Sequence, residues 1–231
     1  EQQLKSERLK TELITNVSHD IKTPLTSIIN YVDLLQKGPA PEQQREYLQV
    51  LNRQAHRLKK LMEDLIEMSK ASTGNLPCHP SRRNVKELIE QAVGEYEDRL
   101  LDAQIEPVIS LPEKSLFCLA DGALMWRILE NLLSNVCKYA QCGTRLYIDI
   151  TEKDGFVAFS FKNISRDRLN ISAEELTERF VRGDISRTTE GSGLGLNIAG
   201  SLVELQGGKF RLNVDGDLFK AEFQIPLDPS S

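Results

Sequence analysis

Two long apolar stripes in the first seventy residues constrain the fold of this chain more than any other feature. In the first stripe, one apolar residue recurs at every seventh position: Ile14, Ile21, Ile28 and Leu35. In the second, apolar residues follow at alternating intervals of three and four: Leu48, Leu51, Ala55, Leu58, Met62 and Leu65. These intervals are typical of helices that bury one face against another helix. The sequence therefore predicts amphipathic helices over about 1–37 and 42–71.

The segment between the two stripes carries the signals that end one helix and begin the next. Gly38 suits a helix C-cap, and Pro41 suits the first turn of a helix. The two helices are therefore expected to form an antiparallel hairpin. Tyr47, Leu61 and Met68 add a second stripe, so that the helices are apolar over more surface than one partner can cover. A second copy would bury the remainder in a dimeric four-helix bundle.

One histidine lies on the flank of the first predicted helix, beside its apolar stripe. His19 is followed directly by Asp20, and Pro24 comes five residues on. Proline removes a helix hydrogen bond, so a bend just after His19 is expected. A histidine beside a carboxylate can take part in proton or nucleophile chemistry. Taken alone, a solvated surface histidine is the more common interpretation of such a residue.

The composition excludes several classes of protein. A net charge of -5 argues against nucleic acid as a partner. No apolar run approaches the length that a membrane-spanning helix needs, so no membrane contact is expected from this stretch of chain. The four cysteines are scattered without a CxxC pair, which favours free thiols in a reducing compartment: Cys78, Cys118, Cys137 and Cys142. The chain begins without Met, in helical sequence, which indicates a piece of a longer protein.

A run of turn-forming residues follows the second helix and predicts a linker. The expected domains are a helical domain over 1–74, a linker over 75–82 and a second domain over 83–231. In the second domain, helices are predicted near 84–103, 121–140, 173–180 and 193–206, and strands near 105–111, 115–120, 145–152, 156–163, 209–214 and 218–225. Because the strands come largely as antiparallel pairs, we expect an α+β fold, an α/β sandwich with helices on one face of a mixed sheet.

Three polar residues share one face of the predicted helix over 121–140. Asn131, Asn135 and Lys138 are spaced by four and three residues, which places them on one stripe of an otherwise apolar helix. A carboxamide oxygen is a neutral ligand for Mg²⁺, and an ammonium group is a point-charge partner for phosphate. The alternative is an ordinary solvated face.

A glycine-rich segment precedes the last predicted helix. Gly191, Gly193 and Gly195 alternate with other residues there. The backbone can therefore approach a ligand, and the start of the helix offers unpaired N–H groups to a phosphate. The segment lacks the Gly-Lys-Ser/Thr of a P-loop and the βαβ surroundings of a dinucleotide-binding turn. The polar residues 182–190 before it suggest a mobile lid over an anionic ligand.

Four segments, taken in order, resemble the motifs of the sensor histidine kinases of bacterial two-component systems. Ser18–Leu25 resembles the phosphoacceptor box, and Asn131–Tyr139 resembles the N box of the Bergerat-type ATP-binding fold. Glu178–Arg182 resembles the F box, and Gly191–Leu196 resembles the second glycine box. The four motifs together cover the chain in the order that this family has.

The resemblance implies a role for each matching residue. His19 would attack the γ-phosphate of ATP, Asp20 would accept the other ring proton of His19, and Asn135 would hold Mg²⁺. The remaining matching residues would surround the nucleotide: Asn131, Lys138, Tyr139, Phe180, Arg182, Arg187, Gly191, Gly193, Leu194 and Gly195. The phosphoryl group would then pass to an aspartate of a response regulator. Thr23 matches the pattern of bifunctional members, in which it helps to position a water that dephosphorylates the regulator. The chain would be the cytoplasmic portion of a membrane-anchored bacterial sensor.

The chain departs from the family pattern at the first glycine box, which usually reads Asp-x-Gly-x-Gly. Lys162–Asp167 occupies that place, with Asn163 where the aspartate would accept the adenine amino group, and both glycines are absent. This departure keeps a second reading open, in which a weak kinase acts mainly as a phosphatase or as a dimeric scaffold that binds the regulator. A third reading is a topoisomerase or chaperone ATPase module, and the helical hairpin with His19 argues against it.

Overall fold

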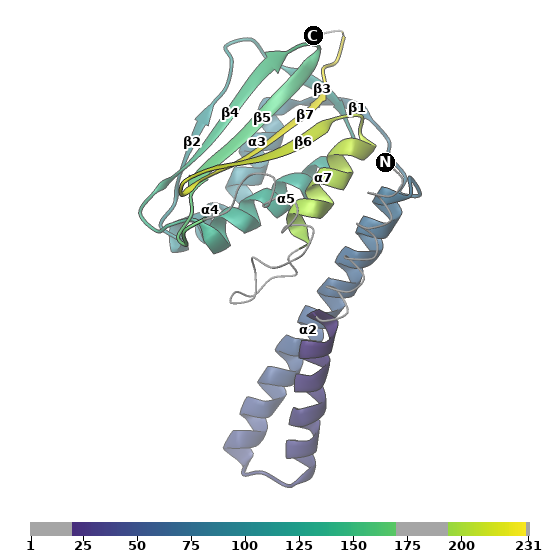
Figure 1. Ribbon diagram of the computed structural model, residues 1–231, viewed down its shortest axis with the longest axis vertical. Coiled ribbons are helices and arrows are strands. Elements are labelled where there is room, and N and C mark those ends of the chain that lie inside the picture. Colours follow the sequence, from purple (N-terminus) through teal and green to yellow (C-terminus); the bar gives the residue numbers. More distant parts are fainter. Residues whose placement is uncertain (1–19, 170–193, 230–231) are drawn as a thin grey trace. The chain divides into compact units, whose positions relative to one another are not determined.

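The computed structural model describes residues 20–169 and 194–229. These residues fall into two compact units (Figure 1). The helical unit comprises the described residues up to Glu67 together with Leu194, and the mixed unit comprises those from Met68 to Leu169 and from Gly195 onward.

The helical unit is a hairpin of two helices. The first helix covers 20–36 of the described residues and continues through Pro24, and α2 covers Pro41–Ser72. Gly38 has a φ of 69° and donates its N–H to the carbonyl of Leu35 at 3.2 Å, which ends the first helix as the sequence predicts. The rings of Tyr31 and Tyr47 meet edge to face, with centroids 5.4 Å apart. The predicted hairpin is confirmed.

The mixed unit is built on a five-stranded sheet in the order β2-β4-β5-β7-β6. Its strands are β2 (Glu106–Ser110), β4 (Arg145–Lys153), β5 (Phe156–Ile164), β6 (Lys209–Asp215) and β7 (Leu218–Pro226). β2 runs parallel to β4, and the other neighbours are antiparallel. Asp154 and Gly155 both have positive φ, of 52° and 78°, which suits the tight hairpin turn between β4 and β5. The predicted mixed sheet is confirmed.

A second, two-stranded sheet joins β1 (Ser81–Asn84) to β3 (Phe117–Ala120). The sequence predicts a linker through residue 82 and no strand there, because these four residues contain no apolar side chain. Tertiary contacts hold β1 instead. The Arg82 guanidinium lies 3.7 Å from the centroid of the Phe117 ring and 2.8 Å from the carboxylate of Asp228.

Helices cover one face of the five-stranded sheet (Figure 1). They are α3 (Val85–Glu95), α4 (Glu97–Asp102), α5 (Gly122–Tyr139) and α7 (Gly195–Leu205). The helix predicted over 84–103 is divided at Tyr96, whose hydroxyl donates to the carbonyl of Glu130 at 3.2 Å. This bond links the break in the helix to α5. Local sequence signals do not reveal a contact between such distant residues, so the sequence predicts one continuous helix.

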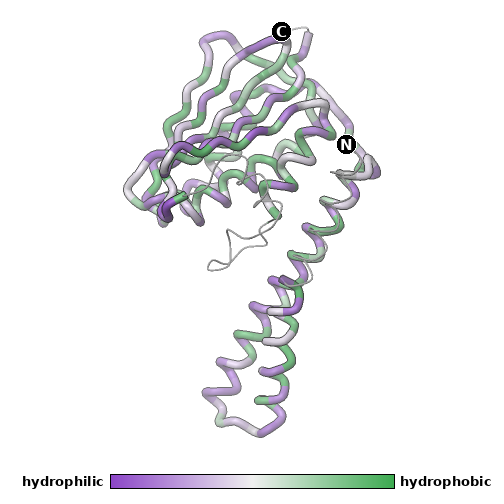
Figure 2. The backbone as a smooth tube through the Cα atoms, viewed as in Figure 1, coloured by the Kyte–Doolittle hydropathy of each residue, from purple (hydrophilic) through white to green (hydrophobic). Residues whose placement is uncertain are grey.

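The core lies between this face of the sheet and the helices. Hydropathy alternates along the strands (Figure 2), and the buried residues of β5 alternate accordingly. The rings of Phe159 and Phe223 stack with centroids 4.4 Å apart. The fully buried residues that α5 and α7 contribute are Met125, Ile128, Leu129, Leu132, Leu133, Ile198, Ala199, Leu202 and Val203.

Candidate functional site

The rotation of α5 about its axis is fixed by its buried apolar face. Leu129, Leu132 and Val136 are buried, whereas Asn131, Asn135 and Lys138 are half-buried at the edge of that face. The helix begins at an N-cap, Asp121, whose side chain accepts the N–H groups of Ala123 and Leu124 at 2.9 and 3.2 Å. The shared polar face that the sequence predicts is therefore present.

Asn131 brings this polar face to the beginning of α7. Its Nδ2 donates to the carbonyl of Arg127 at 2.8 Å, and a Cβ at Gly195 would stand only 2.9 Å from its Oδ1. Gly195 is the first residue of α7, where N–H groups lack partners within the helix and the helix dipole is positive. Residues 64 positions apart thus meet at a place suited to a phosphate.

The end of α5 is fastened to the end of β5 by backbone hydrogen bonds. The N–H of Arg166 donates to the carbonyl of Tyr139 at 2.8 Å, and the N–H of Gln141 donates to the carbonyl of Ile164 at 2.9 Å. A bridge pairs Ala140 with Ser165. These bonds bring the C-terminal end of the polar face of α5 next to the strand end that carries Asn163.

Asn163 is a buried polar residue on the helix-covered face of β5. It shares that face with Phe159 and Phe161 and is only 3% exposed. Its Nδ2 donates to the carbonyl of Ile164 at 3.2 Å, and its Oδ1 is buried with no hydrogen-bond donor among the described residues. Such an acceptor is uncommon in a folded protein and indicates a missing partner.

The phosphoacceptor segment is described only from Asp20 onward. Asp20 is half-buried and Thr23 is exposed, and the two lie one helical turn apart in the helix over 20–36. Leu194 is 6% exposed. The other predicted site residues lie outside the described residues: His19, Phe180, Arg182, Arg187, Gly191 and Gly193.

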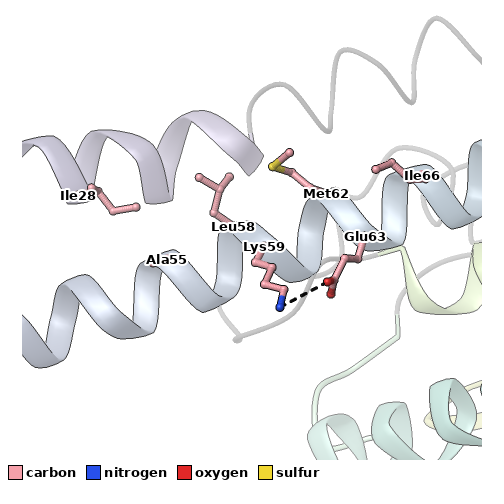
Figure 3. A pocket seen from close by; sticks show the side chains of 7 residues that line it. All are labelled: Ile28, Ala55, Leu58, Lys59, Met62, Glu63 and Ile66. Carbon is pink, nitrogen blue, oxygen red and sulfur yellow. Dashed lines mark ion pairs between the residues drawn. The ribbon is translucent and has the colours of Figure 1, made fainter.

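The helical unit carries an apolar groove between its two helices (Figure 3). The apolar residues that line the groove are Ile28, Ala55, Leu58, Met62 and Ile66. Met62 and Ile66 are each 51% exposed, although both side chains are apolar. An ion pair of 3.8 Å between Lys59 and Glu63 lies at the edge of the groove. Ala55, Leu58 and Met62 belong to the apolar stripe that the sequence predicts for α2, whereas Ile66 lies outside that stripe.

The described residues contain neither a cluster of metal-ligating side chains nor a helix that could span a membrane. Across 20–169 and 194–229, no three His, Cys, Asp or Glu side chains gather closely enough to hold a metal ion. In the same ranges, no helix has both the length and the apolar character needed to cross a membrane.

Comparison with known proteins identifies both parts of the chain. Residues 9–74 match the His Kinase A (phospho-acceptor) domain, and residues 120–229 match the histidine kinase-, DNA gyrase B- and HSP90-like ATPase. Because the two models match in this order, the chain belongs to the sensor histidine kinases of two-component systems. Topoisomerase and chaperone ATPase modules do not contain the phosphoacceptor domain that this chain matches. The interpretation of the chain as such a module is therefore set aside.

Individual relatives agree with this assignment. Sensor histidine kinase YcbM of Bacillus subtilis is 26% identical over 216 residues, covering 90% of this chain and 70% of that protein. Histidine protein kinase SaeS of Staphylococcus aureus is 32% identical over 224 residues, covering 94% and 63%. The crystal structure of histidine kinase ThkA in complex with response regulator protein TrrA has the same fold, with a TM-score of 0.75, 22% identity and coverage of 98% and 65%. The chain spans between 35% and 70% of the length of each of the first three curated relatives.

Proposed function

We propose that this chain transfers the γ-phosphoryl group of ATP to its own His19 and then to an aspartate of a response regulator. The observation that carries the proposal is the contact of Asn131 with Gly195, which joins the polar face of α5 to the N-terminus of α7. Phosphoryl transfer depends on positioning and charge neutralisation more than on covalent chemistry by the protein. The two predicted phosphate-binding elements meet at this contact.

Each residue has a role in this proposal. The carboxamide of Asn135 would hold Mg²⁺, which neutralises phosphate charge, and Lys138 would pair with a phosphate oxygen. The N–H groups at the start of α7 would bind phosphate. Asp20 would accept one ring proton of His19, so that the other ring nitrogen stays unprotonated and nucleophilic. Asn163 would accept a hydrogen bond from the adenine amino group, and Tyr139 would lie against the nucleotide.

The apolar groove of the helical unit supports a second copy of this chain as a partner. A second copy of this chain would cover Met62 and Ile66, whose exposure otherwise leaves apolar surface in water. We assign residues 1–74 to this dimerisation and phosphoacceptor domain and 83–231 to the ATP-binding domain, with a linker over 75–82 whose last two residues begin β1. The crystal structure of ThkA with TrrA supports a response regulator as the second partner.

A phosphatase activity toward the regulator is the second candidate function. Thr23 is exposed one helical turn from Asp20, where its hydroxyl can orient a water. Thr23→Ala should spare labelling of the kinase and slow the loss of phosphate from the regulator. Thr26, exposed on the same helix, supplies the matched control. Equal rates of loss in Thr23→Ala and Thr26→Ala would remove this assignment.

Incubation with γ-labelled ATP and Mg²⁺ tests the kinase activity. The chain should acquire a label that is labile in acid and stable in base, and His19→Gln should acquire none. His56→Gln is the matched control, because His56 is exposed on α2, where its Nδ1 lies 2.8 Å from the carbonyl of Asn52. Labelled His19→Gln would overturn the assignment of the phosphoacceptor. A chain that binds nucleotide but never takes up label would favour the phosphatase or scaffold function.

A further inference from the structure

The Nε of Arg57, on α2 of the helical unit, is buried and has no acceptor among the residues that the structure describes. A buried N–H group without an acceptor destabilises a protein, and more so when it belongs to a charged group. We propose that, in the state that transfers the phosphoryl group, this N–H donates to the backbone carbonyl of Asp20 and thereby positions Asp20. The inference rests on the proposed function and adds a positioning residue to it.

Arg57 lies on the face of α2 that meets the first helix. The less exposed positions of α2 recur every three or four residues, and they include Tyr47 and Arg57. On the first helix the corresponding positions include Asp20, Pro24 and Tyr31. The rings of Tyr31 and Tyr47 are in contact, so these two stripes face one another.

The same aromatic contact gives the level of Arg57 along the hairpin. Ile21 precedes Tyr31 by as many residues as Arg57 follows Tyr47. Because two antiparallel α-helices rise by equal amounts per residue, Ile21 and Arg57 lie at about the same level. Arg57 is therefore close in level to the turn of the first helix that carries Pro24.

A second contact gives a similar level. Ile28 of the first helix lines the apolar groove together with Ala55 and Leu58, which stand on either side of Arg57 in the sequence (Figure 3). Pro24 lies between the levels that the two contacts indicate for Arg57.

Pro24 removes one donor from the first helix at this level. A helix carbonyl normally accepts the N–H of the residue four positions on, and proline has no N–H, so the carbonyl of Asp20 receives no bond from Pro24. Asp20 takes part in another interaction as well, so its carbonyl is distinguished by the missing helical donor and not by a lack of contacts. Because helix carbonyls point toward the C-terminal end, this oxygen points toward Pro24, at the level of Arg57.

A small bend in the first helix brings this donor and this acceptor together. A proline inside a helix permits such a bend, because the hydrogen bond that would resist it is absent. The carbonyl of Asp20 then receives a charge-assisted hydrogen bond, and the Nε–H of Arg57 gains its acceptor. The bond holds the main chain of Asp20 against α2. The carboxylate that is to accept the ring proton of His19 therefore keeps one orientation.

Rates of label uptake from γ-labelled ATP in a double-mutant cycle test the proposal. Arg57→Met keeps an unbranched side chain in the hairpin but removes the donor, and it should slow uptake at saturating ATP about tenfold. The KM for ATP should not change, since the proposed ATP site lies in the mixed unit. Pro24→Ala restores the helical N–H for the carbonyl of Asp20. In that background Arg57→Met should slow uptake by less than about twofold.

Arg53→Met is the matched control, because Arg53 is exposed on α2 one helical turn before Arg57. It should leave the rate unchanged in both backgrounds. Equal slowing by Arg57→Met in the unaltered chain and in Pro24→Ala would show that Arg57 acts through packing, and it overturns this inference alone. An unaltered chain that acquires no label on His19 overturns the proposed function, and the inference falls with it.

Exchange of the Arg57 Nε–H with solvent, followed by nitrogen-15 NMR, decides the question where Pro24→Ala takes up too little label for a rate. The signal is identified by its absence in Arg57→Met. Exchange should be at least about fivefold slower in the unaltered chain than in Pro24→Ala, because only the unaltered chain forms the bond to Asp20. Equal exchange rates overturn the inference.

Discussion

Gly195 lies so close to Asn131 that a Cβ at position 195 would stand 2.9 Å from Oδ1 of Asn131. Asn131 is not free to withdraw, because its Nδ2 is bound to the carbonyl of Arg127 at 2.8 Å. The contact fixes where α7 begins relative to α5. It therefore sets the distance between the two groups of phosphate ligands in the proposed site.

Gly195→Ala should weaken nucleotide binding. The added methyl group forces either the asparagine or the start of α7 to shift, which typically costs about 1–3 kcal/mol. If the strain falls on the bound state, affinity for Mg²⁺–ADP decreases by roughly five- to a hundredfold. Calorimetric titration with ADP measures this change.

The matched control for this prediction is Gly94→Ala. Gly94 lies inside α3, and a Cβ there would meet no atom within 4 Å. Gly94→Ala should leave the free energy of unfolding of the mixed unit unchanged or raise it by up to about 1 kcal/mol. It should leave nucleotide affinity unchanged. Equal affinities for the two variants would show that the contact at Asn131 does not position the site.

The shared face of Asn131 and Asn135 was predictable from sequence, because spacing along one helix follows from helix geometry alone. The hairpin and its end at Gly38 were predictable for the same reason: the signals are local. The order of the motifs indicated a family, and the family indicated the fold. Sequence reasoning succeeded where a single element or a recognisable combination of elements carried the information.

Other features depend on contacts between distant residues and could not be predicted. β1 has no apolar side chain and exists because Arg82 meets Phe117 and Asp228. The break at Tyr96 depends on a bond to α5. Asn163 could be placed by motif, but its burial and its bond to Ile164 became visible only in the folded sheet.

Met62→Glu should dissociate the proposed dimer. Met62 is 51% exposed in the apolar groove of the helical unit, so that a second copy seated there would have to bury the new charge. Affinity between copies should decrease by about a hundredfold or more, which sedimentation over a range of concentrations would reveal. Leu101→Glu is the control, since Leu101 is an apolar side chain, 73% exposed, in the mixed unit. If both variants remain dimeric, the groove is not the interface.

Gly208→Ala should destabilise the mixed unit severely. A Cβ at this position would lie 2.0 Å from the backbone carbonyl of Gln224 and 3.0 Å from that of Val203. Neither atom can rotate aside, so the turn between α7 and β6 must move, at a cost above about 3 kcal/mol. Thermal unfolding measures the loss. Gly200→Ala brings a Cβ 3.4 Å from the Phe210 ring, so it should cost far less, and similar losses would refute the argument.

The carboxylate of Asp121 should stabilise the mixed unit in a manner that depends on pH. Burial acts to raise the pKa of Asp121, but backbone N–H groups of His79, Leu124 and Ala123 donate to it and lower the pKa below its usual value. A depressed carboxyl pKa contributes stability above the unfolded pKa of about 4, and this contribution is lost as pH falls through the folded pKa. Asp121→Ala should cost about 1–2 kcal/mol at neutral pH. The fluorescence of Trp126, the single tryptophan, on α5, reports the unfolding.

Asp121→Asn separates the cap from its charge. The amide oxygen can still accept the N–H groups of Ala123 and Leu124, but its NH₂ group would face the His79 N–H, which now donates to Oδ2 at 2.9 Å. This variant should therefore lie between the native chain and Asp121→Ala at pH 7, and its difference from the native chain should shrink as pH falls below about 4. A difference between native chain and Asp121→Asn that stays constant from pH 7 to pH 3 would show that the charge contributes nothing, and that the cap acts through geometry alone.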